Sequence, residues 1–334
     1  MIAITICIAV TKLFSGCKDE EIDPLISSFT YKDEIDFFSL TSTSTGEISD
    51  YKWHISGNQQ TILLNPTEKS ITLELPTEAT TVNVSLTVQN NERSSTSSQN
   101  IDLPQLTFNR QFGLGRNTNY ELSNNVDYVW YIDQLNTGQH YLANCGPACV
   151  TMAIKWADPF FPKTAEDARN TYLPEGGLWG TYTIIDYLSV NYTDYFVTTL
   201  TEISHLTNQL DCGNIAILCI DMFYVRNHTN NGRSEWRIDK FYNISGENAG
   251  HFIVVKGYKI VDRIVWFEVY DPASMGARYY DGTLKGLDRY YRGEDIMRAT
   301  NVWWPYMIVI SNPAMLSVRS QAIDPSIIVH QLGR

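Results

Sequence analysis

An apolar periodicity that starts at a Cys-Gly-Pro sequence, residues 145–147, constrains the fold more than any other stretch of the chain. Apolar residues recur from position 150 to position 157 at i, i+3, i+4 and i+7, the spacing of one helical face. Pro147 lacks an N–H and has a nearly helical φ, so a helix tolerates it only in the first turn. The pattern therefore predicts a mostly buried helix that begins close to Cys145.

A thiol at the start of a helix is in a position to react. The unpaired N–H groups there and the positive end of the helix dipole favour the thiolate of Cys145 and lower its pKa. The thiolate is the nucleophilic form. The alternative is an ordinary buried thiol, which is common in globular proteins.

Composition restricts the classes of protein to consider. A chain of 334 residues exceeds the usual size of a single core, which predicts two domains. The hydrophobic content of 43% and the 20 tyrosines indicate folded domains. A net charge of −12 excludes binding of nucleic acid through a basic face.

The N-terminal residues favour membrane attachment through lipid. Residues 1–10 form an apolar run that is too short to span a membrane and leads into Cys17. Residues 13–17 resemble the lipobox of a bacterial lipoprotein signal, which implies cleavage before Cys17 and a lipid anchor on it. The acidic run 18–21 resembles the export tag of surface-displayed lipoproteins, which implies the outer membrane of the cell envelope and exposure at its surface. The alternative is an apolar N-terminus with an incidental cysteine.

The remaining cysteines do not favour disulfides. If residues 212–219 were extended, Cys212 and Cys219 would lie about 23 Å apart at ~3.3 Å per residue, too far to bridge. Cys149 follows Cys145 by one helical turn, and we interpret it as a packing residue.

Residues 18–103 have the pattern of a small β domain. Apolar and polar residues alternate over 51–55, 70–75 and 82–88, between clusters of Gly, Asn and Pro. This predicts a sandwich that resembles PKD-like immunoglobulin folds. Its role is either that of a spacer from the membrane or that of a carbohydrate- or protein-binding module. The Ser- and Thr-rich stretch 94–100 predicts a linker.

Residues 104–334 predict a second domain, in which helices precede strands. A short strand is expected at 130–134, followed by the helix at Cys145. Further helices are expected at 165–172 and 182–190, and strands at 215–221, 251–258, 264–270 and 306–311. This segregation is typical of an α+β fold.

A histidine and an aspartate occupy the ends of two of these strands. His251 follows a glycine at the start of one strand, and Asp271 ends the next one. A hairpin around Asp262 and Arg263 would bring both to one end of the sheet. A thiolate, an imidazole that moves the proton and a carboxylate that orients the ring are the parts of a nucleophilic triad. The oxyanion donors would be the backbone N–H of Cys145 and a side-chain amide, from Gln134 or Gln139.

Residues 126–311 resemble the papain-like cysteine peptidases of the C39-like group, through Gln134, Cys145-Gly146-Pro147, Gly250-His251 and Asp271-Pro272. The resemblance implies that Cys145 is the nucleophile, His251 the base, Asp271 the orienting residue and Gln134 the oxyanion donor. Spacing to the cysteine favours Gln139 instead, whereas the strand context favours Gln134.

The sequence thus predicts an Ig-like sandwich followed by an α+β papain-like peptidase domain. Its substrate would be a peptide or protein, cleaved at peptide or isopeptide bonds through an acyl-thioester, with no metal or organic cofactor. The alternatives are a transglutaminase or a cell-wall peptide amidase with the same triad, and a surface binding lipoprotein without activity. A zinc site at His140, Cys145 and Cys149 would lack a fourth ligand.

Overall fold

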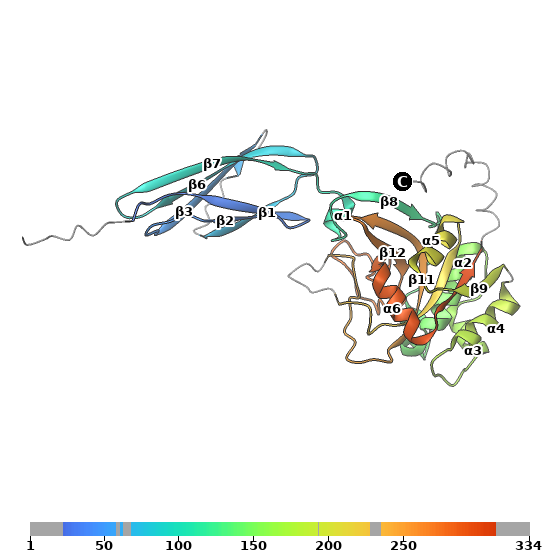
Figure 1. Ribbon diagram of the computed structural model, residues 1–334. Coiled ribbons are helices and arrows are strands. Elements are labelled where there is room, and N and C mark those ends of the chain that lie inside the picture. Colours follow the sequence, from blue (N-terminus) through green and yellow to red (C-terminus); the bar gives the residue numbers. More distant parts are fainter. Residues whose placement is uncertain (1–22, 58–60, 63–67, 193, 228–234, 312–334) are drawn as a thin grey trace, which may run out of the picture. The chain divides into compact units, whose positions relative to one another are not determined.

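The computed structural model describes residues 23–57, 61–62, 68–192, 194–227 and 235–311. The predicted signal segment 1–17, with Cys17, and the acidic run after it lie outside these residues. The chain divides into two compact units, Met1–Gln105 and Leu106–Arg334 (Figure 1). In the part that the structure describes, no helix has the length and apolar character needed to cross a membrane.

The first unit consists of two antiparallel sheets, ordered β1-β2-β5 and β4-β3-β6-β7. The ring of Phe29 on β1 meets that of Trp53 on β3 edge to face at 5.3 Å, so the sheets face each other across an apolar core. The predicted β-sandwich is confirmed. Its strands are β1 Phe29–Asp33, β2 Phe37–Ser42, β3 Asp50–Gly57, β4 Thr61–Ile62, β5 Ser70–Glu74, β6 Thr80–Gln89 and β7 Ser94–Leu103.

The prediction of a linker at 94–100 is wrong. These residues belong to β7, which pairs with β6 along its whole length. Many of their hydroxyl side chains lie on the exposed face, where Thr96 hydrogen-bonds Thr87 across the strands. Only Ile101 and Leu103, at the end of β7, are buried. A strand that is held by backbone pairing needs few apolar residues on its solvent face. The composition of residues 94–100 therefore resembled that of a linker.

The second unit is built on an antiparallel sheet ordered β13-β12-β11-β10-β14-β9, with β8 added beside the second half of β11. Its strands are β8 Thr118–Ser123, β9 Tyr195–Thr199, β10 Ile215–Asp221, β11 Gly250–Val261, β12 Ile264–Tyr270, β13 Arg289–Arg292 and β14 Tyr306–Ile310. Its helices are α1 Phe108–Gln111, η1 Gln134–Asn136, η2 Tyr141–Ala143, α2 Cys145–Ala157, α3 Ala165–Thr171, α4 Thr181–Asn191, α5 Ile203–Asp211 and α6 Gly293–Trp303.

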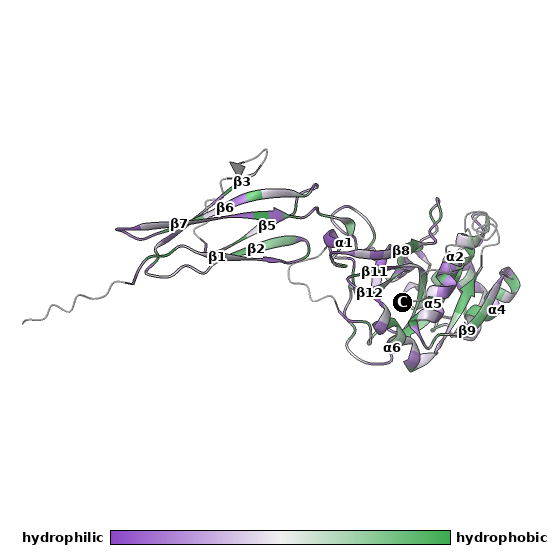
Figure 2. Cartoon of the chain, turned by 45° about the horizontal axis from the view of Figure 1, so that its top comes forward, coloured by the Kyte–Doolittle hydropathy of each residue, from purple (hydrophilic) through white to green (hydrophobic). Residues whose placement is uncertain are grey.

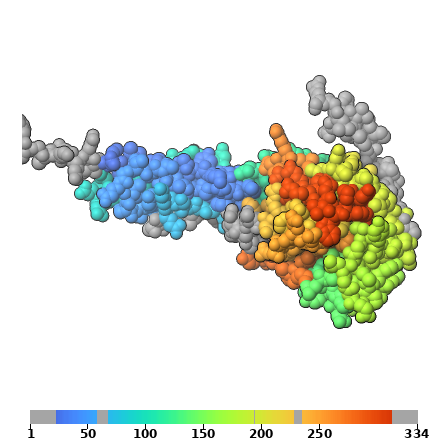
Figure 3. Space-filling view, turned by 60° about the horizontal axis from the view of Figure 1, so that its bottom comes forward, coloured from blue at the N-terminus to red at the C-terminus, as the bar shows by residue number. Residues whose placement is uncertain are grey.

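Helices cover both faces of this sheet. Ile217 and Phe252 pack with α2 in one apolar core, whereas Leu218 and Ile253 pack with α5 and α6 in another. Successive residues of β10 and β11 thus enter opposite cores. Figure 2 shows green, hydrophobic segments of the second unit around β9 and α4. Figure 3 shows α6, in red, at the surface of the second unit. The predicted α+β architecture is confirmed.

The strand predicted at 130–134 is absent. Residues 131–133 form no strand, and Gln134 begins η1, whose first turn is capped by the Asp133 side chain through the N–H of Leu135 at 3.2 Å. The aromatic and β-branched residues there favoured a strand, but the backbone of this segment forms hydrogen bonds with a loop and not with another strand. The N–H of Gln134, for example, donates to the carbonyl of Pro272 at 2.8 Å.

The irregular pairing of β11 at Gly257 predicts a sensitivity to a single methyl group. A Cβ at this position would overlap the carbonyl oxygen of Leu122 on β8 and lie 2.7 Å from the carboxylate of Glu268 on β12. We expect Gly257→Ala to lower the free energy of unfolding by about 1–3 kcal/mol, measured by urea titration. Gly246→Ala is the control, because no atom lies within 4 Å of its added methyl. Equal stability of both variants would contradict the tight packing at Gly257.

Candidate active site

Cys145 is the first residue of α2, as the sequence predicts, and only 8% of it is exposed. Asn144 precedes it but makes no side-chain cap on the helix. Gly146 follows it against the Trp179 side chain, and a Cβ at this glycine would lie 2.9 Å from the Cβ of Trp179. The nucleophile candidate is thus held at an uncapped helix start with little space around it.

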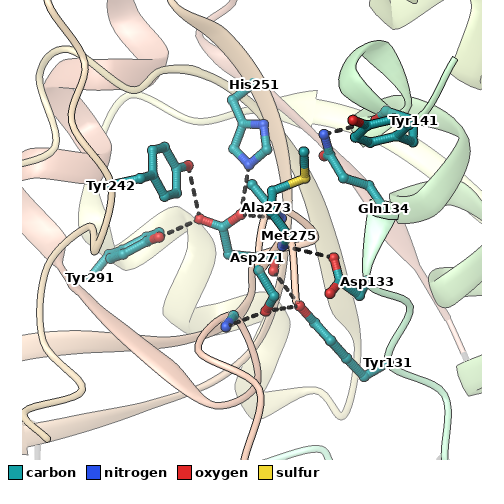
Figure 4. Close-up of polar contacts among 12 residues, drawn as sticks. Tyr131, Asp133, Gln134, Tyr141, Tyr242, His251, Asp271, Ala273, Met275 and Tyr291 are labelled. Atoms are coloured by element: carbon teal, nitrogen blue, oxygen red, sulfur yellow. Dashed lines mark hydrogen bonds and ion pairs between the residues drawn. The ribbon is translucent and has the colours of Figure 1, made fainter. Parts of the chain in front are cut away.

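The β11–β12 hairpin brings His251 and Asp271 together. Its turn is formed by Asp262 and Arg263, both at positive φ, at the opposite end of the hairpin. His251 is the second residue of β11, Asp271 follows β12, and the His251 Nε2 lies 2.8 Å from the Asp271 Oδ1 (Figure 4). The predicted hairpin and the predicted proximity of these side chains are confirmed.

The Cys145 thiol lies beside the His251 ring, which lowers the pKa of the thiol. Because Nε2 faces Asp271, Nδ1 is the ring nitrogen left for the sulfur. The backbone N–H groups of Gly146 and Phe252 also face the sulfur. The structure therefore brings together Cys145, His251 and Asp271, which are far apart in the sequence.

These contacts favour the charged forms of both the sulfur and the ring. Burial raises the pKa of the Cys145 thiol, but the His251 hydrogen bond and charge outweigh it and bring the pKa below its ordinary value. Burial lowers the pKa of His251, but the charges of Asp271 and Cys145 outweigh it and raise this pKa to about 10. The arrangement favours a thiolate beside an imidazolium.

Asp271 is completely buried and is held by four donors. Its Oδ1 accepts from His251 and from the N–H of Ala273 at 2.9 Å. Its Oδ2 accepts from the hydroxyl of Tyr242 at 3.1 Å and from that of Tyr291 (Figure 4). Burial raises the pKa of Asp271, but His251 and these hydrogen bonds bring it below its ordinary value. The carboxylate therefore stays charged and fixed in position.

Of the two glutamines considered as oxyanion donors, Gln134 is buried and Gln139 is exposed. The Gln134 Nε2 donates to the carbonyl of Tyr141 at 3.0 Å, which identifies the amide nitrogen, since a carbonyl can only accept. Its second N–H is left for another acceptor. Its Oε1 is buried and makes no hydrogen bond among the described residues.

The segment that carries Gln134 is tied to the loop after Asp271. The Asp133 carboxylate accepts from the N–H groups of Met275 and Gly276 at 3.0 and 2.8 Å. The hydroxyl of Tyr131 donates to the carbonyl of Asp271 at 2.8 Å (Figure 4). These bonds set the position of Gln134 relative to the hairpin.

The start of β11 is fixed by a buried carboxylate, Asp221 at the end of β10. It accepts from the N–H groups of Asn248 and Ala249 at 2.8 and 3.1 Å and from the indole N–H of Trp303 at 3.1 Å. The Trp303 ring lies over Gly250, where a Cβ would approach it to 2.8 Å. This explains the glycine before His251.

Tyr242, Tyr291 and Asp221 were not among the site residues predicted from the sequence. No motif distinguishes them, because each lies in a different part of the chain and acts on a residue that only the fold brings near. A strand ending in aspartate, as β10 does, was the one available signal.

The other described cysteines, at positions 149, 212 and 219, are free thiols. Burial raises the pKa of Cys149, and burial raises that of Cys219 to about 12. Cys212 is exposed. Among the described residues, no group of three or more His, Cys, Asp or Glu side chains is arranged to hold a metal ion, and His140 lies instead beside Gly176.

Comparisons with known proteins identify a family. Residues 126–293, half of the chain, match the family model described as the Peptidase_C39 like family. A putative C39-like peptidase from Bacillus anthracis is similar in structure, with 14% identity, a TM-score of 0.39 and coverage of 58% of this chain and 98% of its own.

The PKD1 domain of the Vibrio cholerae metalloprotease PrtV is also similar, with 29% identity, a TM-score of 0.21 and coverage of 24% of this chain and 98% of its own. No curated protein matches the chain significantly. The architecture and the arrangement of Cys, His and Asp side chains accompany the match to the family model. Because this match covers half of the chain, the chain belongs to the Peptidase_C39 like family.

Proposed function

We propose that this protein is a cysteine peptidase that hydrolyses peptide or isopeptide bonds through an acyl-thioester on Cys145. The observation that carries the proposal is the buried chain of contacts from the Cys145 thiol to His251 and from His251 to Asp271. Membership of the family supports a peptidase as the general class.

The proposed reaction uses the thiolate and imidazolium forms. The Cys145 sulfur attacks the carbonyl carbon, and the C–S bond forms as the carbonyl π electrons move to oxygen. Collapse of this intermediate breaks the C–N bond, and His251 gives its proton to the leaving amine. Water then attacks the thioester, His251 takes a proton from it, and the released sulfur completes the cycle.

The oxyanion of each tetrahedral intermediate needs two donors. We propose the backbone N–H of Cys145, at the start of α2 where no side chain caps the helix, and the second N–H of Gln134. Preformed donors of this kind stabilise the intermediate more than the planar substrate. This assigns Gln134, rather than the exposed Gln139, to catalysis.

The location of the activity follows from a separate prediction. If Cys17 carries a lipid, as the signal-like residues predict, the enzyme acts on peptides or proteins at the cell envelope. This anchor stays a prediction from the sequence.

Peptide cleavage tests the proposed function directly. The purified protein, incubated with a diverse peptide library, should yield new peptide ends detected by mass spectrometry. Cys145→Ala should yield none, because no thioester can form. Equal products from both proteins, or none from either, would contradict the proposal. Cross-linked or deamidated glutamine products in the wild type alone would favour acyl transfer.

The choice between the two glutamines is tested by paired substitutions. Gln134→Ala should lower kcat by roughly 100- to 1,000-fold, the usual cost of one oxyanion donor, on a peptide that the wild type cleaves. Alkylation of Cys145 by iodoacetamide should hardly change, because this reaction forms no oxyanion. Gln139→Ala is the matched control and should keep wild-type kcat. The reverse ranking would transfer the role to Gln139.

The charge of Asp271 should control the pH range of the nucleophile. Asp271→Asn removes the charge that raises the pKa of His251 to about 10, so the imidazolium becomes less stable and the thiolate loses its partner. The thiolate titration should move to higher pH, and alkylation of Cys145 near pH 6 should slow by roughly ten-fold or more. Asp186→Asn, on the exposed face of α4, is the control. An unchanged titration in Asp271→Asn would show that this carboxylate does not control the protonation of Cys145 and His251.

A further inference from the structure

Arg169, on α3, is a buried cation whose head group contacts the residues that precede Cys145. It is 2% exposed, and among the described residues it forms no ion pair with a carboxylate. A guanidinium without a counter-charge is costly to bury, so its position requires an explanation beyond packing.

The guanidinium instead holds the two residues before Cys145. Its Nε donates to the Asn144 Oδ1 at 2.7 Å, and its Nη2 donates to the carbonyl of Ala143 at 2.9 Å. Its Nη1 donates to the carbonyl of Leu173 at 3.3 Å, within the adjoining turn. These donors are spread over the planar fork of an arginine, which a lysine cannot reproduce.

This attachment explains why Asn144 does not cap α2. Asparagine at this position usually accepts from the first N–H groups of a helix. Here the Asn144 Oδ1 is occupied by Arg169, and its Nδ2 donates to the carbonyl and hydroxyl of Thr137 at 2.9 and 3.0 Å. The first N–H groups of α2 therefore remain available to the sulfur and to an oxyanion.

The Trp179 ring completes the enclosure. The Arg169 guanidinium carbon lies 5.7 Å from the centre of this ring, and the same tryptophan packs against Gly146. Arg169 thus contacts the segment before the nucleophile and a side chain that covers the residue after it.

We propose that Arg169 is a positioning residue for Cys145, which keeps the start of α2 uncapped and supplies a buried positive charge that favours the thiolate. The inference deepens the proposed function and rests on it.

The electrostatics of the two side chains agree with this geometry. Burial lowers the pKa of the Arg169 guanidinium, and the charge of the Cys145 thiolate opposes this effect. The other titratable groups around the sulfur, from each element that packs there, are Cys149 on α2, Cys219 on β10, Tyr242, His251 on β11 and Asp271 after β12. Among all these groups, His251 and Arg169 are the only two cations.

The test measures alkylation of Cys145 by iodoacetamide as a function of pH, by mass spectrometry, with the exposed Cys212 as internal reference. Arg169→Gln keeps a donor but removes the charge, so the titration should shift to higher pH and the rate near pH 6 should fall roughly ten-fold. Arg169→Lys keeps the charge without the fork and should give a smaller shift in the same direction.

Lys155→Gln is the matched control. Lys155 lies in the last turn of α2, the helix that begins with Cys145. Its Nζ also donates to a backbone carbonyl, that of Phe161 at 3.0 Å. This variant loses one positive charge far from the sulfur and should titrate as the wild type does.

A titration of Arg169→Gln equal to that of Lys155→Gln would overturn the inference. If Arg169→Gln does not fold, Arg169→Lys decides, and a wild-type titration in it would overturn the inference equally. A purely structural role would lower the melting temperature and leave the pH midpoint unchanged. Because alkylation needs no substrate, absence of peptide cleavage would sink the proposed function without deciding this result.

Discussion

The burial of the Asp271 carboxylate is the interaction on which the rest of the site depends. A charge with no exposed surface is tolerated only when donors replace the lost water. Here two tyrosine hydroxyls, a backbone N–H and the His251 ring do so, from β13, from β11 and from the adjoining loops. Because these donors come from separate segments, only the folded second unit can keep this carboxylate both buried and charged.

The sheet makes this assembly rigid. His251 pairs with Ile220 of β10. The next residue of β10, Asp221, fixes the start of β11 through the N–H of Asn248. The β11–β12 pairing then sets Asp271 relative to His251. The helix α2 packs on the same strands, so Cys145 meets a ring whose backbone and carboxylate partner are already held. Preorganisation of this kind removes the cost of arranging polar groups during a reaction.

Much of this was predictable from local patterns, and the limits of those patterns are physical. The positions of Cys145, His251 and Asp271 at the ends of elements follow from periodicity, from Pro147 and from the turn at Asp262. Strand β7 was missed because its exposed Ser and Thr residues resemble a loop, whereas backbone pairing with the preceding strand β6 holds it. The run 130–134 was predicted to be a strand because composition does not reveal whether a neighbouring strand has a free edge.

The support around the triad was beyond such reasoning for a different reason. Tyr242, Tyr291 and Arg169 act on partners 29, 20 and 25 residues away in the sequence, through contacts that exist only after folding. Burial by itself would keep the thiol of Cys145 protonated, and His251 with the backbone N–H groups of Phe252 and Gly146 reverses this effect. The reactivity of a buried thiol therefore depends on all the polar groups around it. For this reason, the sequence pattern of an apolar helix that begins with a cysteine was compatible with both an inert and a reactive thiol.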